Sequence, residues 1–238
     1  MSSIKGSLYL IPTTLGDNEP LDVLPLLVKK VIDELDIFIV ENEKTARKFI
    51  KKISPTKSQQ ALKLFSIDKY ANQVEVKTFL DSCIKGISVG LLSEAGVPCI
   101  ADPGAEMVKL AHQKNIKVIP LVGPSSILMA MMASGFNGQN FAFNGYLPID
   151  SNDRKKSIKN LEKLSKEHNQ SQLFIETPYR NDKMLEDIKS TLSPHTMLCV
   201  ACDITLQTEY IKTLSIEGWK KETVNLHKRP TIFIIHKE

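Results

Sequence analysis

The chain has 238 residues, 42% hydrophobic and 24% charged; these are proportions of a globular protein of one or two domains and exclude a disordered chain. Basic residues number 31 and acidic residues 27, so the formal charge of +4 does not by itself indicate a nucleic-acid-binding protein. Four cysteines are too few for a secreted disulfide scaffold, and no run reaches the ~18 apolar residues of a membrane span. With no signal-peptide pattern near Met1, we expect a cytoplasmic protein.

The first half of the chain alternates between strand and helix patterns. Short β-rich runs predict strands over residues 7–13, 37–42, 62–67, 87–93 and 117–123. Longer stretches between them have helical spacing, and helices are expected over 21–36, with Leu24, Leu27, Val28, Val31 and Leu35 on one face, and over 75–86, ending at Gly86. This alternation predicts a parallel sheet with helices on both faces and all strand-to-helix loops along one edge.

The connection after the fourth predicted strand is longer than the about two to six residues that such a turn normally needs. It runs Ser-Glu-Ala-Gly-Val-Pro-Cys-Ile-Ala-Asp-Pro-Gly over residues 93–104. Asp102 followed by Pro103 predicts a helix start with Asp102 as the N-cap. The rest of the segment is unexplained by a helix start, and its place on the ligand side of the sheet suggests the wall of a binding site.

A second domain is expected from Gly123 onwards, so that residues 1–122 and 123–238 form two α/β domains, the first with a mostly parallel sheet and the second with a mixed sheet. Helices are predicted over 125–135, 154–168 and 181–192, and strands over 140–147, 172–177 and 197–203. The segments 208–222 and 229–237 have the pattern of strands with turn signals.

Standard motifs are absent from the sequence. It contains no Walker A sequence, no G-x-G-x-x-G after the first strand, no H-E-x-x-H and no G-x-S-x-G, which disfavours nucleotide hydrolysis, dinucleotide binding and metal or serine hydrolysis. Cys199 and Cys202 form a C-x-x-C, but no second ligand pair accompanies them, so we expect a buried strand and no metal.

Several segments together resemble one superfamily. They are LYLIPTTLGD, LLSEAGVPCIADPG, VIPLVGPSSILMAMMASG, FNGYLP and FIETPYR, in this order along most of the chain. They look like the tetrapyrrole-methylase superfamily of class III methyltransferases and, within it, like the family of ribosomal RNA small subunit methyltransferase I. The resemblance implies two α/β domains with S-adenosylmethionine bound in the cleft between them, a methyl transfer to a ribose 2′-hydroxyl of 16S ribosomal RNA (a cytidine), and a homodimer.

The departures from the family pattern concern the residues that would face a substrate. The family's A-E-D-T-R reads Val40-Glu41-Asn42-Glu43-Lys44 here, Glu94 and Val97 stand for the Asp and Thr of S-D-A-G-T-P, and Asp17 stands for Asn. The family's A-R-E-L-T reads Ala201-Cys202-Asp203-Ile204-Thr205, which loses an arginine. Methyl transfer is therefore a firmer expectation than the identity of the acceptor.

By the same resemblance, the cofactor would be lined by ten residues: Pro12, Ala95, Gly96, Val97, Ile100, Ala101, Ser125, Ser126, Thr177 and Pro178. Small residues let backbone groups approach a ligand, and a helix start favours an anion such as the methionine carboxylate. For Ser125 and Ser126 simple N-capping is the alternative.

A ribose hydroxyl is a poor nucleophile at neutral pH, so a base or hydrogen-bond acceptor would help. Glu41 and Glu94 are the candidate catalytic residues, with a surface acid or a loop brace as the alternative role. Lys44, Arg47 and Arg180 are candidates for binding substrate phosphate, with a solvated helix face as the alternative.

Three functions remain open from the sequence. The first is an S-adenosylmethionine-dependent methyltransferase that acts on ribosomal RNA. The second keeps the cofactor but has a tetrapyrrole-like or other small molecule as the acceptor. The third is a non-catalytic relative that binds cofactor or RNA, which the altered segment 41–44 motivates.

Overall fold

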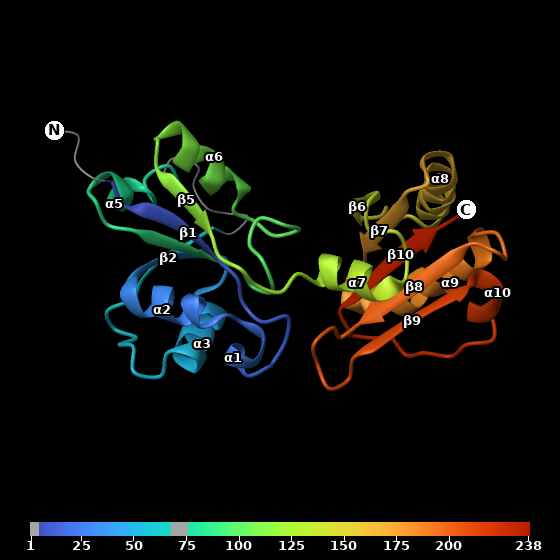
Figure 1. The fold of residues 1–238 in the computed structure, drawn as a ribbon, viewed down its shortest axis with the longest axis horizontal. Helices are drawn as coiled ribbons and strands as arrows, with labels where there is room; N and C mark the ends of the chain where they lie inside the picture. Colours follow the sequence, from blue (N-terminus) through green and yellow to red (C-terminus); the bar gives the residue numbers. More distant parts are fainter. Residues whose placement is uncertain (1–4, 68–75) are drawn as a thin grey trace. The chain divides into compact units, whose positions relative to one another are not determined.

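The computed structural model describes residues 5–67 and 76–238, which form two compact units, Met1–Ser125 and Ser126–Glu238 (Figure 1). Each unit has its own sheet and its own core, and each is described by itself below. Within the described ranges, no helix is long and apolar enough to cross a membrane.

The first unit contains a five-stranded sheet whose order is β3-β2-β4-β1-β5, with every described pair parallel. Its strands are β1 (Ser7–Ile11), β2 (Ile37–Val40), β3 (Lys63–Ser66), β4 (Val89–Leu92) and β5 (Lys117–Pro120). All five predicted strands are confirmed. The inner strands β2 and β4 are almost wholly buried, as is typical of a parallel sheet covered on both faces, whereas the edge strands β3 and β5 are exposed or partly buried.

Helices cover both faces of this sheet, on opposite sides of it in Figure 1. One face carries α1 (Pro20–Val23), α2 (Leu26–Glu34) and α3 (Glu43–Ile53), and the other carries α5 (Asp81–Ile84) and α6 (Ala105–Gln113). Alternate strand residues serve the two cores: Ile11 and Leu92 pack with α2 and α3, whereas Leu8 and Leu91 pack with α5 and α6.

The helix predicted over 21–36 is interrupted at Pro25. Leu24, which precedes this proline, has extended dihedrals (φ −113°, ψ 137°), because a proline disfavours the helical conformation of the residue before it. The break turns Leu27 out of the predicted apolar face, and its side chain is 56% exposed, while Leu24, Val28, Val31 and Leu35 are buried as expected.

For the helix predicted over 75–86, the predicted first residue, Glu75, lies outside the described residues. The described part of this range contains α5. Its predicted end is confirmed. Gly86 has φ 89° and donates its N–H to Cys83 O at 3.1 Å, while Ile87 N–H reaches Ser82 O at 3.0 Å. These two hydrogen bonds around a left-handed glycine end the helix and provide partners for its last carbonyl groups.

The second unit has a mixed sheet in the order β6-β7-β10-β8-β9, as predicted. Its strands are β6 (Phe141–Tyr146), β7 (Ser171–Ile175), β8 (Met197–Cys202), β9 (Tyr210–Ser215) and β10 (Thr231–His236). β6 is parallel to β7, and the other three pairs are antiparallel.

The helices of this unit are α7 (Ser126–Ser134), α8 (Ser151–His168), the short 3₁₀ helix η1 (Pro178–Arg180), α9 (Asn181–Thr191) and α10 (Ile216–Trp219). The strand pattern expected over 208–222 is wrong in its second part, where Ser215 accepts a hydrogen bond from Gly218 N–H and caps α10. Trp219 in this helix is fully buried and donates its indole N–H to Leu198 O at 2.8 Å.

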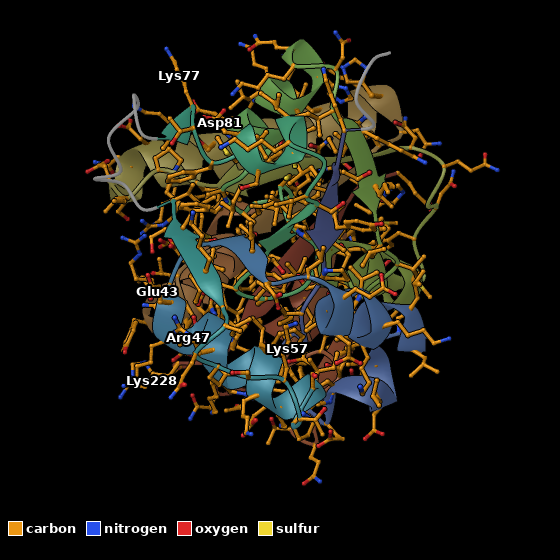
Figure 2. The ribbon with its side chains drawn as sticks, turned by 90° about the vertical axis from the view of Figure 1, so that its left-hand side faces the viewer. Glu43, Arg47, Lys57, Lys77, Asp81 and Lys228 are labelled. Carbon is orange, nitrogen blue, oxygen red and sulfur yellow. The ribbon has the colours of Figure 1, made fainter. Side chains whose placement is uncertain are left out.

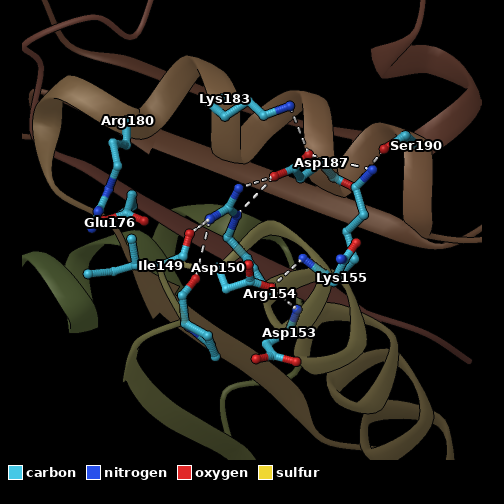
Figure 3. Close-up of polar contacts among 12 residues, drawn as sticks. Ile149, Asp150, Asp153, Arg154, Lys155, Glu176, Arg180, Lys183, Asp187 and Ser190 are labelled. Atoms are coloured by element: carbon cyan, nitrogen blue, oxygen red, sulfur yellow. Dashed lines mark hydrogen bonds and ion pairs between the residues drawn. The ribbon is translucent and has the colours of Figure 1, made fainter.

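A buried ion pair joins α8 to α9 (Figure 3). Arg154 donates from Nε and Nη2 to Asp187 Oδ2 at 2.9 and 2.5 Å, and from Nη1 to Ile149 O at 2.6 Å. Burial alone would raise the pKa of Asp187, but the hydrogen bonds and charges of Arg154 and Lys183 hold it below its usual value. The pair therefore fixes both helices and the chain that enters α8.

Cys199 and Cys202 lie in β8, as expected, and both side chains are fully buried. Because they are three residues apart in a strand, they point to opposite faces of the sheet and cannot converge on one ion. Among the described residues, no group of three or more His, Cys, Asp or Glu side chains is placed to hold a metal.

Candidate functional site

The topology of the first unit favours one place for a ligand. β1 and β4 are neighbours, yet the chain leaves β1 toward α1 and α2 on one face and leaves β4 toward α6 on the other. The strand order changes direction here, and in open α/β sheets ligands bind in the crevice outside the carboxyl ends of such strands. The segments that follow these strands, 12–18 and 93–104, are therefore the first candidates for a site.

Hydrogen bonds connect these two segments closely. Thr13 N–H donates to Gly96 O at 2.9 Å, and the hydroxyls of Thr13 and Ser93 lie 3.2 Å apart. Gly96 has φ +74°, and a Cβ added to it would lie 2.9 Å from Leu15 Cδ2 and 3.0 Å from Pro124 O. Both the left-handed backbone and the tight contacts require glycine at this position.

The second half of the long loop contains strained backbone. Cys99 (φ 69°), Ala101 (φ 55°) and Gly104 (φ 118°) all have left-handed conformations. A non-glycine residue in this region costs about 1–2 kcal/mol, and such residues cluster where a loop is shaped for a ligand. Between the two strained residues, Ile100 presents an apolar side chain that is 54% exposed.

The prediction of Asp102 as the N-cap of α6 is wrong. The helix begins at Ala105 with Gly104 at the cap position and no side-chain cap, because the left-handed turn at Gly104 separates Asp102 from the helix. Asp102 lies instead against Glu41. Burial, a hydrogen bond with Glu41 and the negative charges of Glu41 and Glu94 raise the pKa of Asp102 to about 8.

Glu41 is the residue that follows β2, and its Oε1 is fully buried with no N–H or hydroxyl donor among the described side chains and backbone. Two carboxylates can hydrogen-bond to one another only if one of them carries a proton. Burial and the neighbouring carboxyl groups therefore favour the protonated form of Asp102, which is the direction in which its pKa is shifted.

Glu94 is exposed and accepts a hydrogen bond from Thr45 Oγ1 at 2.6 Å, which connects the long loop to the first turn of α3. The structure thus places three carboxyl groups at the carboxyl ends of the adjacent strands β2 and β4. Two of them are the predicted catalytic candidates, and the third is Asp102.

Next to this cluster is a pocket of about 230 Å³ between α3 and the segment after β1. It is lined by Thr13–Asn18, by Thr45, Ala46, Lys48, Phe49 and Lys52 of α3, and by Leu92–Ala95. Lys52 closes one end, since its Nζ donates to Asp17 Oδ1 at 2.9 Å and to Asn18 O at 2.7 Å.

The predicted cofactor residues are divided between the two units. In the first unit Pro12 is buried against Gly123, whose missing Cβ leaves room for the proline ring, and Ala95, Val97, Ile100, Ala101 and Ser125 belong to the segments around it. In the second unit Ser126 begins α7, while Thr177 and Pro178 lie at the start of η1, after β7.

The predicted phosphate-binding residues have different surroundings. Lys44 is exposed and forms no ion pair with a described residue. Arg47 donates to Gln59 O at 2.7 Å and lies 3.9 Å from Glu43 on the outer side of α3 (Figure 2). Arg180 donates to the buried carboxylate of Glu176 at 2.6 Å, which already satisfies part of its guanidinium.

Sequence reasoning missed Asp102, Lys48 and Lys52 as site residues. Asp102 was interpreted as a helix N-cap because Pro103 follows it. Lys48 and Lys52 were indistinguishable from other surface lysines. Their spacing from Thr45, three and seven residues, places them on one helix face, and this was the available signal.

Comparisons with known proteins agree with this architecture. Ribosomal RNA small subunit methyltransferase I of Vibrio cholerae is 28% identical over 96% of this chain and 76% of its own length, and the protein of that name from Halalkalibacterium halodurans is 29% identical over 96% and 73%. The solved structure of the methyltransferase CobJ has a TM-score of 0.64 at 14% identity, covering 98% of this chain and 94% of its own.

The fold is also shared with uroporphyrin-III C-methyltransferase of Thermus thermophilus in complex with S-adenosylhomocysteine, which covers 98% of both chains with a TM-score of 0.56 at 15% identity. The family model described as Tetrapyrrole (Corrin/Porphyrin) Methylases matches residues 7–218, which is most of the chain. The chain therefore belongs to the tetrapyrrole methylase family, whose members are S-adenosylmethionine-dependent methyltransferases.

Proposed function

We propose that this methyltransferase acts on a ribose 2′-hydroxyl of small-subunit ribosomal RNA. The observation that carries the proposal is the similarity over at least 96% of the chain to proteins named ribosomal RNA small subunit methyltransferase I. The same resemblance supports a homodimer in the cytoplasm, which size-exclusion chromatography with light scattering would test for the oligomeric state.

The residues proposed to hold the cofactor are Pro12, Ala95, Gly96, Val97, Ile100, Ala101 and Ser125 of the first unit and Ser126, Thr177 and Pro178 of the second. The strained loop around the exposed Ile100 fits an adenosine, because it offers backbone groups and apolar surface without ionised side chains of its own between Gly96 and Ala101. When bound, S-adenosylmethionine supplies a methyl group activated by a positive sulfonium.

Methylation of a hydroxyl releases one proton as the new O–C bond forms, the S–C bond breaks and the sulfur becomes a neutral thioether. Glu94 is the proposed acceptor of this proton, because it is exposed beside the pocket and its orientation is held by Thr45. Glu41 is the proposed partner that keeps Asp102 protonated, so that only part of the cluster is negatively charged near the substrate. Lys44, Arg47 and Arg180 remain proposed contacts for RNA phosphates.

Two measurements test the proposal. Calorimetry should find one S-adenosylhomocysteine bound per chain. Incubation of the protein with labelled S-adenosylmethionine and small ribosomal subunits that lack the modification should yield a 2′-O-methylated nucleoside on digestion. A methylated base, or no labelled RNA at all, would reject the acceptor while leaving cofactor binding intact.

The role of Glu94 has its own test. Glu94→Gln should lower kcat by about 10²–10⁴-fold with little change in S-adenosylhomocysteine affinity, because general-base catalysis contributes on this scale. Glu106→Gln, which removes an exposed acid from the first turn of α6, is the matched control. Equal activity of the two variants would exclude Glu94 as the base.

A further inference from the structure

The pocket between α3 and residues 13–18 has the chemistry of a nucleotide subsite. We infer that it holds one nucleotide of the RNA acceptor strand, with the Lys48 ammonium on a backbone phosphate and Phe49 as the apolar wall. This inference rests on the proposed function, and it names residues that the resemblance does not assign to any role.

The charge of α3 supports an anionic ligand. The helix has five basic residues and one acidic residue, a surplus as large as the formal charge of +4 of the whole chain. Most of these cations have partners: Lys52 pairs with Asp17, Arg47 with Glu43, and Lys51 donates to Pro55 O at 2.6 Å. Over residues 5–67 and 76–238, Lys48 forms no ion pair and lines the pocket while remaining exposed.

The position of Lys48 at the pocket also has an electrostatic signature. The pKa of Asp17 is lowered first by its hydrogen bond from Lys52, then by the charge of Lys52, and in addition by the charge of Lys48. Lys48 is therefore close enough to the segment after β1 to act on a charge there. A phosphate entering between Lys48 and Lys52 would meet two ammonium groups and only one carboxylate at this end.

The Thr45–Glu94 contact also lines the pocket, one helical turn, or about 5 Å, from Lys48 along α3. This separation is comparable to the reach of one nucleotide from its ribose to its phosphate. A phosphate on Lys48 would therefore place a ribose hydroxyl toward Glu94, the proposed proton acceptor. Phosphate contacts of this kind position a strand and do not read its sequence.

The volume of the pocket limits the ligand. About 230 Å³ is below the about 300–1,000 Å³ of pockets that enclose whole drug-sized ligands, so it accommodates part of a chain and not a complete macrocycle of four pyrrole rings. The apolar wall comes from Phe49, which is half-buried and packs on the core of this unit. An RNA strand passing over α3 would insert one unit and leave its neighbours outside.

The test compares Lys48→Gln with Lys51→Gln, two exposed lysines of one helix of which only the first lines the pocket. Methylation of small ribosomal subunits by Lys48→Gln should have a kcat/KM about tenfold lower, as expected for losing a hydrogen bond to a charged group. The dependence of log KM on log salt should also lose about 0.7 from its slope, the value for one phosphate of a single strand. Lys51→Gln should behave as the wild type in both measurements.

Binding of S-adenosylhomocysteine and thermal stability, measured on the same variants, should be unchanged by either substitution. Equal effects of the two substitutions on kcat/KM and on the salt slope would overturn the pocket assignment while the RNA activity stood. If the wild-type protein itself labels no RNA, the proposed function fails, and the inference fails with it. The two failures are therefore distinguishable from the wild-type reaction alone.

Discussion

At the residue scale, the raised pKa of Asp102 gives a prediction about pH. The folded state holds a proton on Asp102 up to a pKa of about 8, whereas the unfolded chain releases it near 3.8. The folded state therefore binds more protons between these values, and the contribution of Asp102 to stability decreases as the pH rises through this window.

Asp102→Asn should remove this dependence, since an amide can donate to Glu41 at every pH. Thermal unfolding from pH 5 to pH 9 should show a smaller loss of Tm with pH for the variant than for the wild type. Parallel curves for the two proteins would show that Asp102 is ionised in the folded state.

Gly123 gives a second prediction at this scale. A Cβ at Gly123 would lie 2.3 Å from both Cβ and Cγ of Pro12, a separation that the rigid proline ring cannot relieve. Gly123→Ala should destabilise the first unit by about 1–3 kcal/mol, as overpacking does. Gly138→Ala is the control, because nothing lies within 4 Å of its added Cβ. The midpoint of urea unfolding measures the stability of each variant. Equal midpoints for Gly123→Ala and Gly138→Ala would contradict a close contact between Gly123 and Pro12.

At the scale of elements, the pair between α8 and α9 should behave as a buried charge network. Arg154→Met leaves Asp187 without its two closest hydrogen bonds and frees the carbonyl of Ile149 (Figure 3). Removing one partner of a buried pair typically costs about 3–5 kcal/mol. Lys183 at 3.2 Å from Asp187 will offset part of this cost.

The double variant Arg154→Met, Asp187→Leu should recover most of the loss, because apolar side chains of similar volume can replace a buried ion pair at little cost. Denaturant unfolding of the two single variants and the double variant measures their coupling. Strictly additive losses would indicate that the two side chains act independently.

The elements also show what can be predicted from sequence and what cannot. Short apolar runs were sufficient to predict the ten strands, including partly exposed edge strands such as β3 and β9, and Gly86 was sufficient to predict a helix end. The helix break at Pro25 was not predicted, because the apolar periodicity continued past this proline. The residue before a proline nevertheless avoids the helical conformation. Ser215 was missed as a helix cap because the strand pattern before it extended into the helix.

The candidate site was harder to predict because its parts converge only through strand order. Glu41 and Asp102 are far apart in the sequence, and they meet because β2 and β4 are adjacent in the sheet. Nothing in the local pattern says that these strands are neighbours. The role of Lys48 could not be predicted for the same reason, since the pocket that it lines is completed by residues that follow β1 and β4.

At the scale of the whole molecule, the accessibility of the cysteine thiols tests the fold and the proposed cofactor-binding loop, residues 93–104. All four cysteines are free; Cys83, Cys199 and Cys202 are fully buried, and only Cys99, in the strained loop, is partly exposed. Burial and the charge of Asp102 raise the pKa of the Cys99 thiol, so its reaction should be slow near pH 7 and faster at higher pH.

An alkylating reagent should therefore label one thiol in the native protein and four after denaturation, as counted by mass spectrometry. Saturating S-adenosylhomocysteine should slow the labelling of Cys99, because the proposed cofactor residues flank it. Unchanged labelling in the presence of bound ligand would place the cofactor away from this loop.

The position of β10 in its sheet has a consequence for biosynthesis. β10 (Thr231–His236) lies between β7 and β8, and each of them is hydrogen-bonded to it and not to the other. The sheet of the first unit is complete once Pro120 has been made, whereas that of the second stays divided until residues 231–236 emerge from the ribosome. A nascent chain arrested before this strand should already protect its first half from protease while its second half is still digested.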